Sequence, residues 1–200
     1  MKNKVNIVIS AVIIVIIALL SSGCASFRAS NFPPVSQWLP RYPANGKSIC
    51  IIVSVERTFN GKEQEVTFRS LKFRREQVAK LYQDSGLFSE VETGMSDTDL
   101  KAEIKIIDRN KRNIGIAILT GLTLYLLPSK GTEELIVKAT IKNKDGNTLG
   151  MYEKSEIVTS WVQLFLIFAM PFNFPGSVYE ETLRDLNRST IVELHSKGFL

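Results

Sequence analysis

The sequence contains very few of the residues that enzymes use for metal binding and nucleophilic catalysis. Its 200 residues include one histidine, His195, and two cysteines, Cys24 and Cys50. Common zinc sites need several cysteine and histidine ligands, and a serine hydrolase triad would have to use His195. There is also no glycine-rich phosphate loop ending in Lys followed by Ser or Thr. We therefore expect a protein without catalytic residues, without a metal site and without a cofactor.

The sequence also lacks a strong excess of either charge. It has 25 basic and 20 acidic residues, and removing residues 1–23 takes away Lys2 and Lys4 and leaves 23 basic residues. A protein that binds nucleic acid needs a concentrated basic face, so no nucleic-acid partner is expected. The hydrophobic fraction of 44% is typical of a folded globular chain.

The amino terminus is the most informative stretch. Lys2 and Lys4 precede an apolar run over residues 5–20, and small residues then lead to Cys24. This order is typical of a secretory signal peptide. An uncleaved transmembrane anchor and an ordinary signal peptide with an unrelated cysteine are the alternative interpretations.

The residues Ser21, Ser22, Gly23 and Cys24 resemble the lipobox of bacterial lipoproteins, although that family usually has leucine where Ser21 stands. The resemblance implies a diacylglyceryl group on the thiol of Cys24, cleavage between Gly23 and Cys24, and usually an acylated new amino terminus. The membrane would then be a partner through this lipid. Ala25 replaces the aspartate that keeps many family members at the inner membrane. The resemblance therefore implies a lipid-anchored cell-envelope protein on the periplasmic face of the outer membrane.

The chain divides into three regions. Residues 1–23 are the expected signal peptide, residues 24–47 a proline-rich tether, and residues 48–200 a single domain. Proline fixes its own φ, lacks a backbone donor and disfavours the helical conformation of the residue before it. A flexible tether of ~20 residues would span ~25 Å.

Period-two alternation of apolar residues predicts strands over residues 48–59 and 100–107. Two further alternating stretches flank Asp145-Gly146, which predicts a hairpin with a type I′ turn. Shorter strands are expected over residues 65–68 and 87–91.

Apolar residues at helical spacing predict helices over residues 70–85 and 177–197. Ser70 would cap the first helix, and Ser177 with Glu180 would form a capping box for the second. The expected fold class is α+β, with a mainly antiparallel sheet, two helices packed on one face and two apolar inserts at one end of the sheet.

These inserts are residues 114–127 and 161–174, and neither contains a charged residue. If the flanking strands form a meander, both inserts emerge from the same end of the sheet. The candidate membrane or partner contacts in and beside them are Arg109, Lys111, Arg112, Leu122, Leu124, Tyr125, Trp161, Phe165 and Phe168.

Three interpretations of the inserts are open. They could complete the core of the domain, or they could form a hairpin that dips into the leaflet holding the lipid or meets a membrane-embedded partner. They could also span a membrane, although a spanning helix needs ~20 apolar residues and these segments are shorter.

The element order β-α-β-β-β-β-α, with the link Gly-Leu-Phe-Ser-Glu-Val after the first helix, resembles small envelope lipoproteins such as the activators of penicillin-binding proteins. It is also similar to the amino-terminal domain of the Tol-system propeller protein. The resemblance implies a non-enzymatic module that binds another envelope protein. A small-ligand or lipid carrier that uses the two inserts and a hydrolase that uses carboxylates such as Glu103 or Asp108 are the competing hypotheses.

Overall fold

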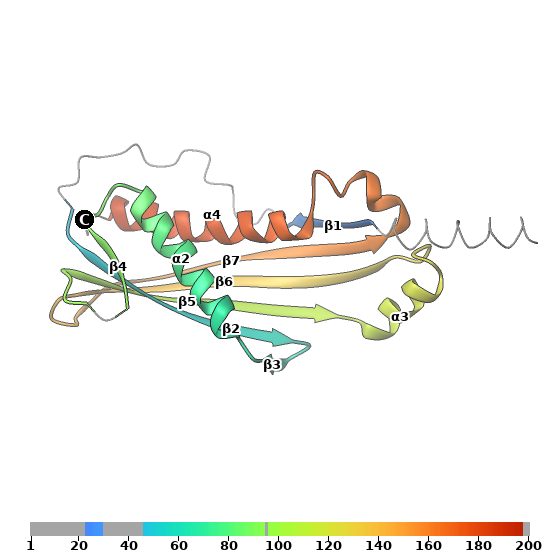
Figure 1. The fold of residues 1–200 in the computed structure, drawn as a ribbon, viewed down its shortest axis with the longest axis horizontal. Helices are drawn as coiled ribbons and strands as arrows, with labels where there is room; N and C mark the ends of the chain where they lie inside the picture. Colours follow the sequence, from blue (N-terminus) through green and yellow to red (C-terminus); the bar gives the residue numbers. More distant parts are fainter. Residues whose placement is uncertain (1–22, 30–45, 95, 198–200) are drawn as a thin grey trace, which may run out of the picture.

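A computed structural model describes residues 23–29, 46–94 and 96–197 of the chain (Figure 1). Within these ranges, three α-helices and one 3-10 helix accompany a seven-stranded sheet. The predicted α+β fold with a mostly antiparallel sheet is confirmed. The expected number of two helices is too low, because a third helix forms inside the first apolar insert.

The sheet has the strand order β1-β7-β6-β5-β2-β3, and β4 pairs with β2 beside this path. Three of its strands, β5, β6 and β7, form an antiparallel meander. By contrast, β2 runs parallel to both β4 and β5, because the helix α2 lies between them in the chain and returns it to the starting edge. The strands are β1 (Gly23–Arg28), β2 (Ile49–Phe59), β3 (Lys62–Gln64), β4 (Val91–Thr93), β5 (Leu100–Arg112), β6 (Ser129–Asn143) and β7 (Thr148–Gln163).

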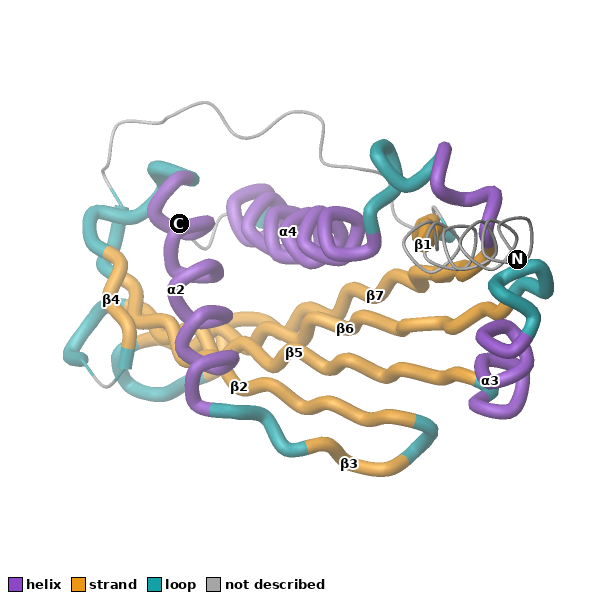
Figure 2. Tube along the Cα trace, turned by 45° about the vertical axis from the view of Figure 1, so that its right-hand side comes forward, coloured by secondary structure: helices purple, strands orange, loops and turns teal. Residues whose placement is uncertain are grey.

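The two long helices, α2 (Phe68–Asp84) and α4 (Pro175–Ser196), cover the same face of the sheet, as the turned view in Figure 2 also shows. The cap of α2 is Thr67, whose hydroxyl accepts a hydrogen bond from the Ser70 amide, so the helix begins before the predicted cap. The second helix also begins earlier than predicted. Its first residue is Pro175, which suits a position where no backbone donor is needed.

The hydrophobic core lies between these two helices and the sheet. Tyr82 of α2, Leu186 of α4 and Ile104 of β5 are among its largest fully buried side chains. Burying one large aliphatic side chain stabilises a fold by about 1.5–3 kcal/mol. The other face of the sheet carries cross-strand ion pairs such as Lys138 with Glu153. The core is therefore complete without the two apolar inserts.

The hairpin of β6 and β7 is confirmed, but its turn differs from the predicted type I′. Of the two turn residues, only Gly146 has a left-handed φ, at 85°. Its amide donates to the carbonyl of Asn143. Two short strands are also shifted, since the return strand β3 lies at Lys62–Gln64 and β4 begins only at Val91.

The structure differs from the predicted tether at its first residues. Gly23–Arg28 form β1, an edge strand antiparallel to β7 in which Cys24 lies opposite Val162. The side chains of Ser26 and Ser160 add a hydrogen bond of 2.6 Å between the two strands. Cys24 is thus part of the sheet, and no flexible length separates it from the domain. The remainder of the tether at 30–45 and the signal peptide at 1–22 lie outside the described residues.

Candidate functional site

The two apolar inserts lie together at one end of the sheet, on the right in Figure 1. The first contains α3 (Ile114–Leu122), which follows β5, and the second contains the 3-10 helix η1 (Leu164–Phe168), which follows β7. A backbone hydrogen bond of 2.9 Å joins them, from the Leu164 amide to the Tyr125 carbonyl. The prediction that the inserts are neighbours in space is confirmed.

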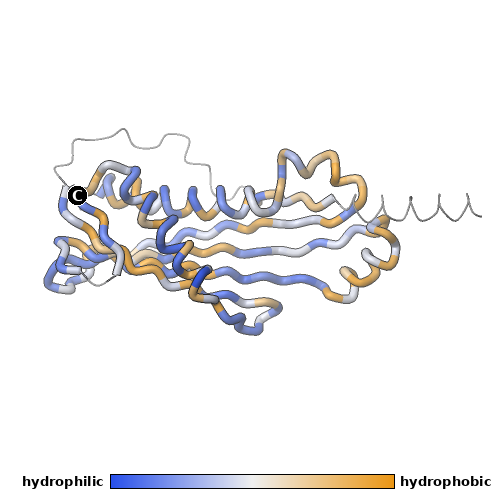
Figure 3. Tube along the Cα trace, viewed as in Figure 1, coloured by the Kyte–Doolittle hydropathy of each residue, from blue (hydrophilic) through white to orange (hydrophobic). Residues whose placement is uncertain are grey.

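Most apolar side chains of these inserts are exposed, and Figure 3 shows hydrophobic residues along both segments at this end. In α3 only Thr120 is buried, and in η1 no residue is buried. The exposed large residues are Ile114, Ile116, Ile118, Leu119, Leu122, Leu124, Leu126, Leu127, Trp161, Phe165, Phe168, Phe172 and Phe174. The interpretation that the inserts complete the core is wrong, because α2 and α4 already cover the core face.

Local interactions define where α3 begins and ends. Asn113 caps it by accepting a hydrogen bond from the Ile116 amide, at 3.1 Å. After the helix, Leu124 and Tyr125 have φ values of 50° and 64°, a left-handed conformation that is uncommon for large side chains and strained. The Tyr125 amide closes this turn on the Thr120 carbonyl at 2.8 Å. The strained turn directs the chain from α3 towards η1.

The composition of α3 is unusual for a surface helix. A helix on a soluble protein normally has one apolar stripe and one polar face, whereas a helix that is apolar all round lies in apolar surroundings. α3 carries no charged side chain, and its isoleucine and leucine residues are exposed. Its sequence therefore suits a lipid or protein environment better than water.

We call the exposed apolar side chains of residues 114–127 and 161–174 the apolar end. Cys24 lies beside it. β1 is hydrogen-bonded to β7 along one side, and on the other the Ser26 amide donates to the Asn173 carbonyl at 2.9 Å. Gly23 contacts η1 so closely that a Cβ atom there would lie 2.0 Å from the Ile167 amide nitrogen. Gly23 would be removed with the signal peptide, but Cys24 itself pairs with Val162 of the second insert, so the expected lipidation residue lies directly beside that insert.

The thiol of Cys24 is partly exposed. Burial raises the pKa of this thiol, and the positive charge of Arg112 only partly offsets the effect. Reactive catalytic cysteines have a lowered pKa, so Cys24 does not have the surroundings of a nucleophile.

The structure brings most of the predicted contact residues to this end. Leu122, Leu124, Phe165, Phe168 and Trp161 are exposed there, and Tyr125 is half-buried in the turn. Lys111 and Arg112 are exposed at the end of β5, directly before α3. Arg109 is different, since it forms an ion pair of 3.3 Å with Glu134.

The helix α3 has nine residues, which corresponds to a length of about 13 Å. In the part of the chain that the structure describes, no helix combines the length and the apolar composition needed to cross a membrane.

A polar pocket of about 450 Å³ lies on the helix-covered face, where α2 and α4 begin. Asp108 is 3% exposed, and its Oδ2 accepts hydrogen bonds from Arg57 Nε at 3.1 Å and from the Tyr179 hydroxyl at 3.4 Å. Its Oδ1 and the Oδ1 of Asn110 have no donor among the described residues. Sequence reasoning considered Asp108 but missed Glu133, because Thr-Glu-Glu at the start of a strand has no distinctive pattern.

Glu133 completes an acid pair with Asp108. Burial and the negative charge of Asp108 raise the pKa of Glu133 to about 7, while the positive charge of Arg112 opposes this shift. Burial and the same aspartate raise the pKa of Tyr179 to about 12. Glu133 therefore titrates near neutral pH, well above the range of an ordinary glutamate.

This acid pair predicts a pH dependence of stability. An acid whose pKa rises on folding stabilises the fold fully below its unfolded pKa, ~4.5 for Glu133, and this contribution is lost as the pH rises through 7. We expect Glu133→Gln, which mimics the protonated form, to unfold with a free energy about 1–2 kcal/mol higher than wild type at pH 8. The free energies of unfolding of the two proteins should be close at pH 4.5.

Urea denaturation at both pH values measures this difference. Glu134→Gln is the matched control, because Glu134 is the neighbouring residue and pairs with the exposed Arg109. A free-energy difference between wild type and Glu133→Gln that does not change with pH would contradict the raised pKa of Glu133.

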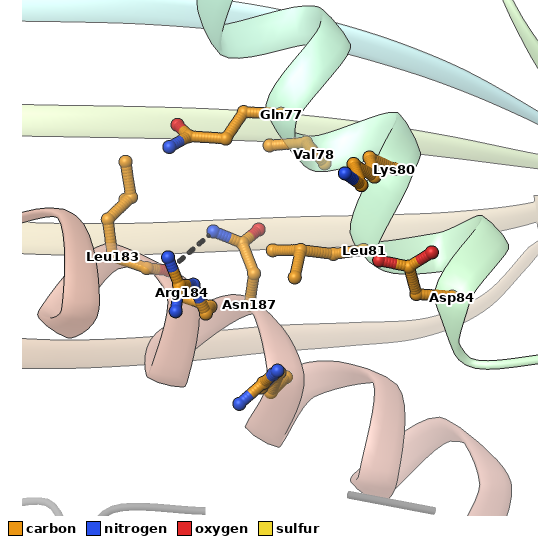
Figure 4. A pocket seen from close by; sticks show the side chains of 9 residues that line it. Gln77, Val78, Lys80, Leu81, Asp84, Leu183, Arg184 and Asn187 are labelled. Atoms are coloured by element: carbon orange, nitrogen blue, oxygen red, sulfur yellow. Dashed lines mark hydrogen bonds between the residues drawn. The ribbon is translucent and has the colours of Figure 1, made fainter.

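Another hollow, of about 280 Å³, lies between α2 and α4 (Figure 4). Val78, Leu81 and Leu183 form its apolar floor, and charged residues such as Lys80 and Arg184 surround it. The amide nitrogen of Asn187 donates to the Leu183 carbonyl of its own helix at 2.8 Å. The hollow is thus the polar rim of the helix–helix contact.

Glu103, the other carboxylate considered for hydrolysis, is not beside Asp108 in the polar pocket. It accepts two hydrogen bonds from Lys142 Nζ, at 2.7 and 2.8 Å, in a cross-strand ion pair. Lys142 neutralises its charge and occupies both of its oxygens. No group of three or more histidine, cysteine, aspartate or glutamate residues suited to a metal ion occurs within residues 23–29, 46–94 and 96–197.

No protein-family model matches the sequence, and no curated protein matches it. Among solved structures, one that is similar is a PelC dodecamer from Paraburkholderia phytofirmans, a variant with one leucine replaced by methionine, with 9% sequence identity and a TM-score of 0.33. The match covers 70% of this chain and 79% of that chain. A likeness at this level does not define a family or a function.

Proposed function

We propose that the chain is a lipid-anchored cell-envelope protein whose apolar end lies in the leaflet that holds the lipid of Cys24. The observation that carries the proposal is the common position of Cys24, α3 and η1. Cys24 pairs with Val162 of β7, β7 leads directly into η1, and η1 is hydrogen-bonded to the turn after α3. Any lipid on Cys24 would therefore start beside the exposed apolar side chains.

The energetics favour such a combination. A diacylglyceryl group together with an amide-linked acyl chain supplies more than the two signals that stable anchoring takes, so the lipid alone would hold the chain in the leaflet. Exposed leucine, isoleucine and phenylalanine residues gain about 25 cal/mol for each Å² that they bury in the hydrocarbon. The apolar end would add to this affinity and orient the domain at the point where the lipid is attached.

The protein acts by contact rather than by catalysis in this proposal. The acid pair of Asp108 and Glu133 has no histidine, metal ligand set or activated nucleophile beside it among the described residues. The role of the protein in this proposal is to bind another envelope protein or the membrane itself. Following the lipoprotein resemblance and Ala25, we assign it to the periplasmic face of the outer membrane.

A lipid or small-ligand carrier is the second candidate. A pocket of about 850 Å³ is lined by Ile116 of the first insert and Trp161 at the start of the second. Mass spectrometry of the protein purified in mild detergent distinguishes the two functions. A carrier retains one lipid in a fixed ratio after extensive washing, whereas a membrane-contacting end retains a variable mixture that exchanges with detergent.

The lipid anchor is tested by mass spectrometry of the protein from its own membrane. We expect the mature chain to begin at Cys24 and to carry a diacylglyceryl group and an amide-linked acyl chain. Cys24→Ala should retain residues 1–23 and carry no lipid, while Cys50→Ala, which alters the buried second cysteine, should be lipidated normally. A mature chain without lipid, or one that begins elsewhere, would contradict the proposal.

A further inference from the structure

A hollow between α3 and the sheet has an electrostatic character unlike that of its surroundings. Its volume is about 850 Å³, and it is bordered by the β2–β3 turn, the end of β5, the start of β6 and Trp161. Three of its lining residues are basic, Lys111, Arg112 and Lys130, and none is acidic. We call these three residues the basic triad.

The basic triad differs from the other cations of the sheet in its pairing. Four of the five cations elsewhere on β5 and β6 form an ion pair with a glutamate, as Lys105 does with Glu56 and Lys138 with Glu153. No member of the basic triad forms a salt bridge with a carboxylate in the described residues. Lys130 instead lies over the Trp161 ring, with Nζ 5.8 Å from the ring centroid. Lys111 and Lys130 are therefore available to an anion from outside the chain, whereas the charge of Arg112 also acts on Glu133 and on the Cys24 thiol.

Contacts of its backbone and its side-chain stem fix the position of Arg112. The Asn60 side chain brackets Arg112, because its Nδ2 donates to the Arg112 carbonyl at 3.0 Å and its Oδ1 accepts from the Arg112 amide at 2.9 Å. The stem of Arg112 crosses Gly131, where a Cβ atom would lie only 2.7 Å from Arg112 Cγ. The next residue, Asn113, caps α3, so the positive end of the helix dipole also faces this region.

The walls of the hollow also have an apolar part that continues into the apolar end. Ile116 and Pro128 line it, and Ile116 belongs to the exposed surface of α3. A ligand that matches this arrangement has an anionic group for the cations and a hydrocarbon chain for α3. Tryptophan and snorkelling lysine side chains are also favoured at the interface of a bilayer.

We propose that this pocket binds the phosphate of an anionic phospholipid headgroup, so that the apolar end selects anionic lipids from the leaflet. The inference rests on the proposed function, since the headgroup reaches the pocket only when α3 lies in the leaflet. Each basic residue at an anionic surface increases affinity about fivefold. The basic triad should thus favour anionic over zwitterionic lipid by at least tenfold.

The test uses Trp161 as the reporter in the full lipidated chain. The sequence has two tryptophans, so Trp38→Phe leaves Trp161 alone. The protein is reconstituted in phosphatidylcholine vesicles that contain a small fraction of brominated phosphatidylglycerol or the same fraction of brominated phosphatidylcholine. We expect much stronger quenching of Trp161 by the brominated phosphatidylglycerol, and the excess should disappear in high salt.

Substitutions distinguish binding in the pocket from a general effect of the protein's net charge. Lys111→Gln, Arg112→Gln and Lys130→Gln together should make the two lipids quench equally. The matched control combines Lys47→Gln, Lys80→Gln and Lys101→Gln, which removes the same charge far from the pocket and should keep the excess quenching. An equal loss of the excess quenching in both triple variants would overturn the assignment to the pocket, because it would show that only the net charge matters.

The remaining outcomes distinguish this inference from the proposed function. If both brominated lipids quench wild-type Trp161 equally, the end is inserted but has no headgroup site, and the inference is overturned alone. If neither lipid quenches Trp161, the membrane placement fails as well. Loss of the excess on adding inorganic phosphate would show a pocket for a free anion, and would overturn the lipid assignment.

Discussion

Replacing Leu119, Leu122 and Phe168 by serine is expected to weaken binding to phospholipid vesicles roughly a thousandfold. These side chains are 52%, 76% and 79% exposed, and they lie on α3 and η1. Moving the exposed part of each into hydrocarbon contributes about 1.5 kcal/mol, and three such contributions correspond to about three powers of ten in affinity. Vesicle flotation of residues 24–200 with Cys24→Ser, which carries no lipid, measures the change.

The chain offers a closely matched control for this experiment. Phe68, Phe73 and Met151 are 79%, 53% and 77% exposed, and they lie on α2 and β7 away from the apolar end. Their replacement by serine lowers the exposed hydrophobicity by a similar amount and should leave vesicle binding within about threefold of wild type. If the two triple variants lose affinity equally, the bilayer contact is not specific to α3 and η1.

Arg28→Met is expected to lower the free energy of unfolding by about 3–5 kcal/mol. Arg28 lies on β1, and its Nη1 is 2.6 Å from Asp185 of α4 while its Nη2 is 3.9 Å from Glu156 of β7. Both carboxylates are buried or nearly so. Removing one partner of a buried ion pair leaves a charge that water cannot reach, which is why the loss exceeds that of a surface pair. Urea denaturation of the two proteins measures the difference.

Two further variants test this explanation. Lys138→Met removes one partner of an exposed pair with Glu153, and it should cost less than about 1 kcal/mol. Adding Glu156→Gln and Asp185→Asn to Arg28→Met should recover most of the lost stability, because the uncompensated charges disappear. A loss of stability that persists in the triple variant would mean that packing of the arginine stem dominates.

The regular elements of the fold could be predicted because their patterns are local. Alternation along β2 and β5 and the apolar stripes of α2 and α4 reflect one buried face each, and the structure has these elements within a few residues. The caps were less predictable. Thr67 and Ser70 are both common cap residues, and the predicted cap Ser177 lies inside α4, which begins at Pro175.

The role of β1 could not be predicted from its residues. Gly23-Cys-Ala-Ser-Phe-Arg28 has little alternation, and its strand conformation depends on β7, whose paired residues lie 130 to 140 positions later in the chain. The same holds for Glu133 and Asp108, whose proximity depends on the register of β5 and β6. Register is a tertiary property, since a shift of one residue reverses the face of every side chain.

The inserts show the opposite case, in which the sequence was distinctive but its interpretation was open. Apolar residues without charge suit either a core or a membrane. The choice depends on whether α2 and α4 leave part of the sheet uncovered, and the structure shows that Ile118, Leu122 and Phe168 remain outside the completed core.

The central claim is that the apolar end lies in the bilayer beside the lipid of Cys24, and depth-dependent quenching tests it most directly. A fluorophore is attached to the full lipidated chain through one cysteine at position 122, 168 or 147, while Cys50 stays buried. Position 147 lies in the β6–β7 turn at the opposite end of the sheet. The account predicts strong quenching by lipids brominated in the acyl chain at positions 122 and 168 and none at 147. Absence of quenching at all three positions would contradict it.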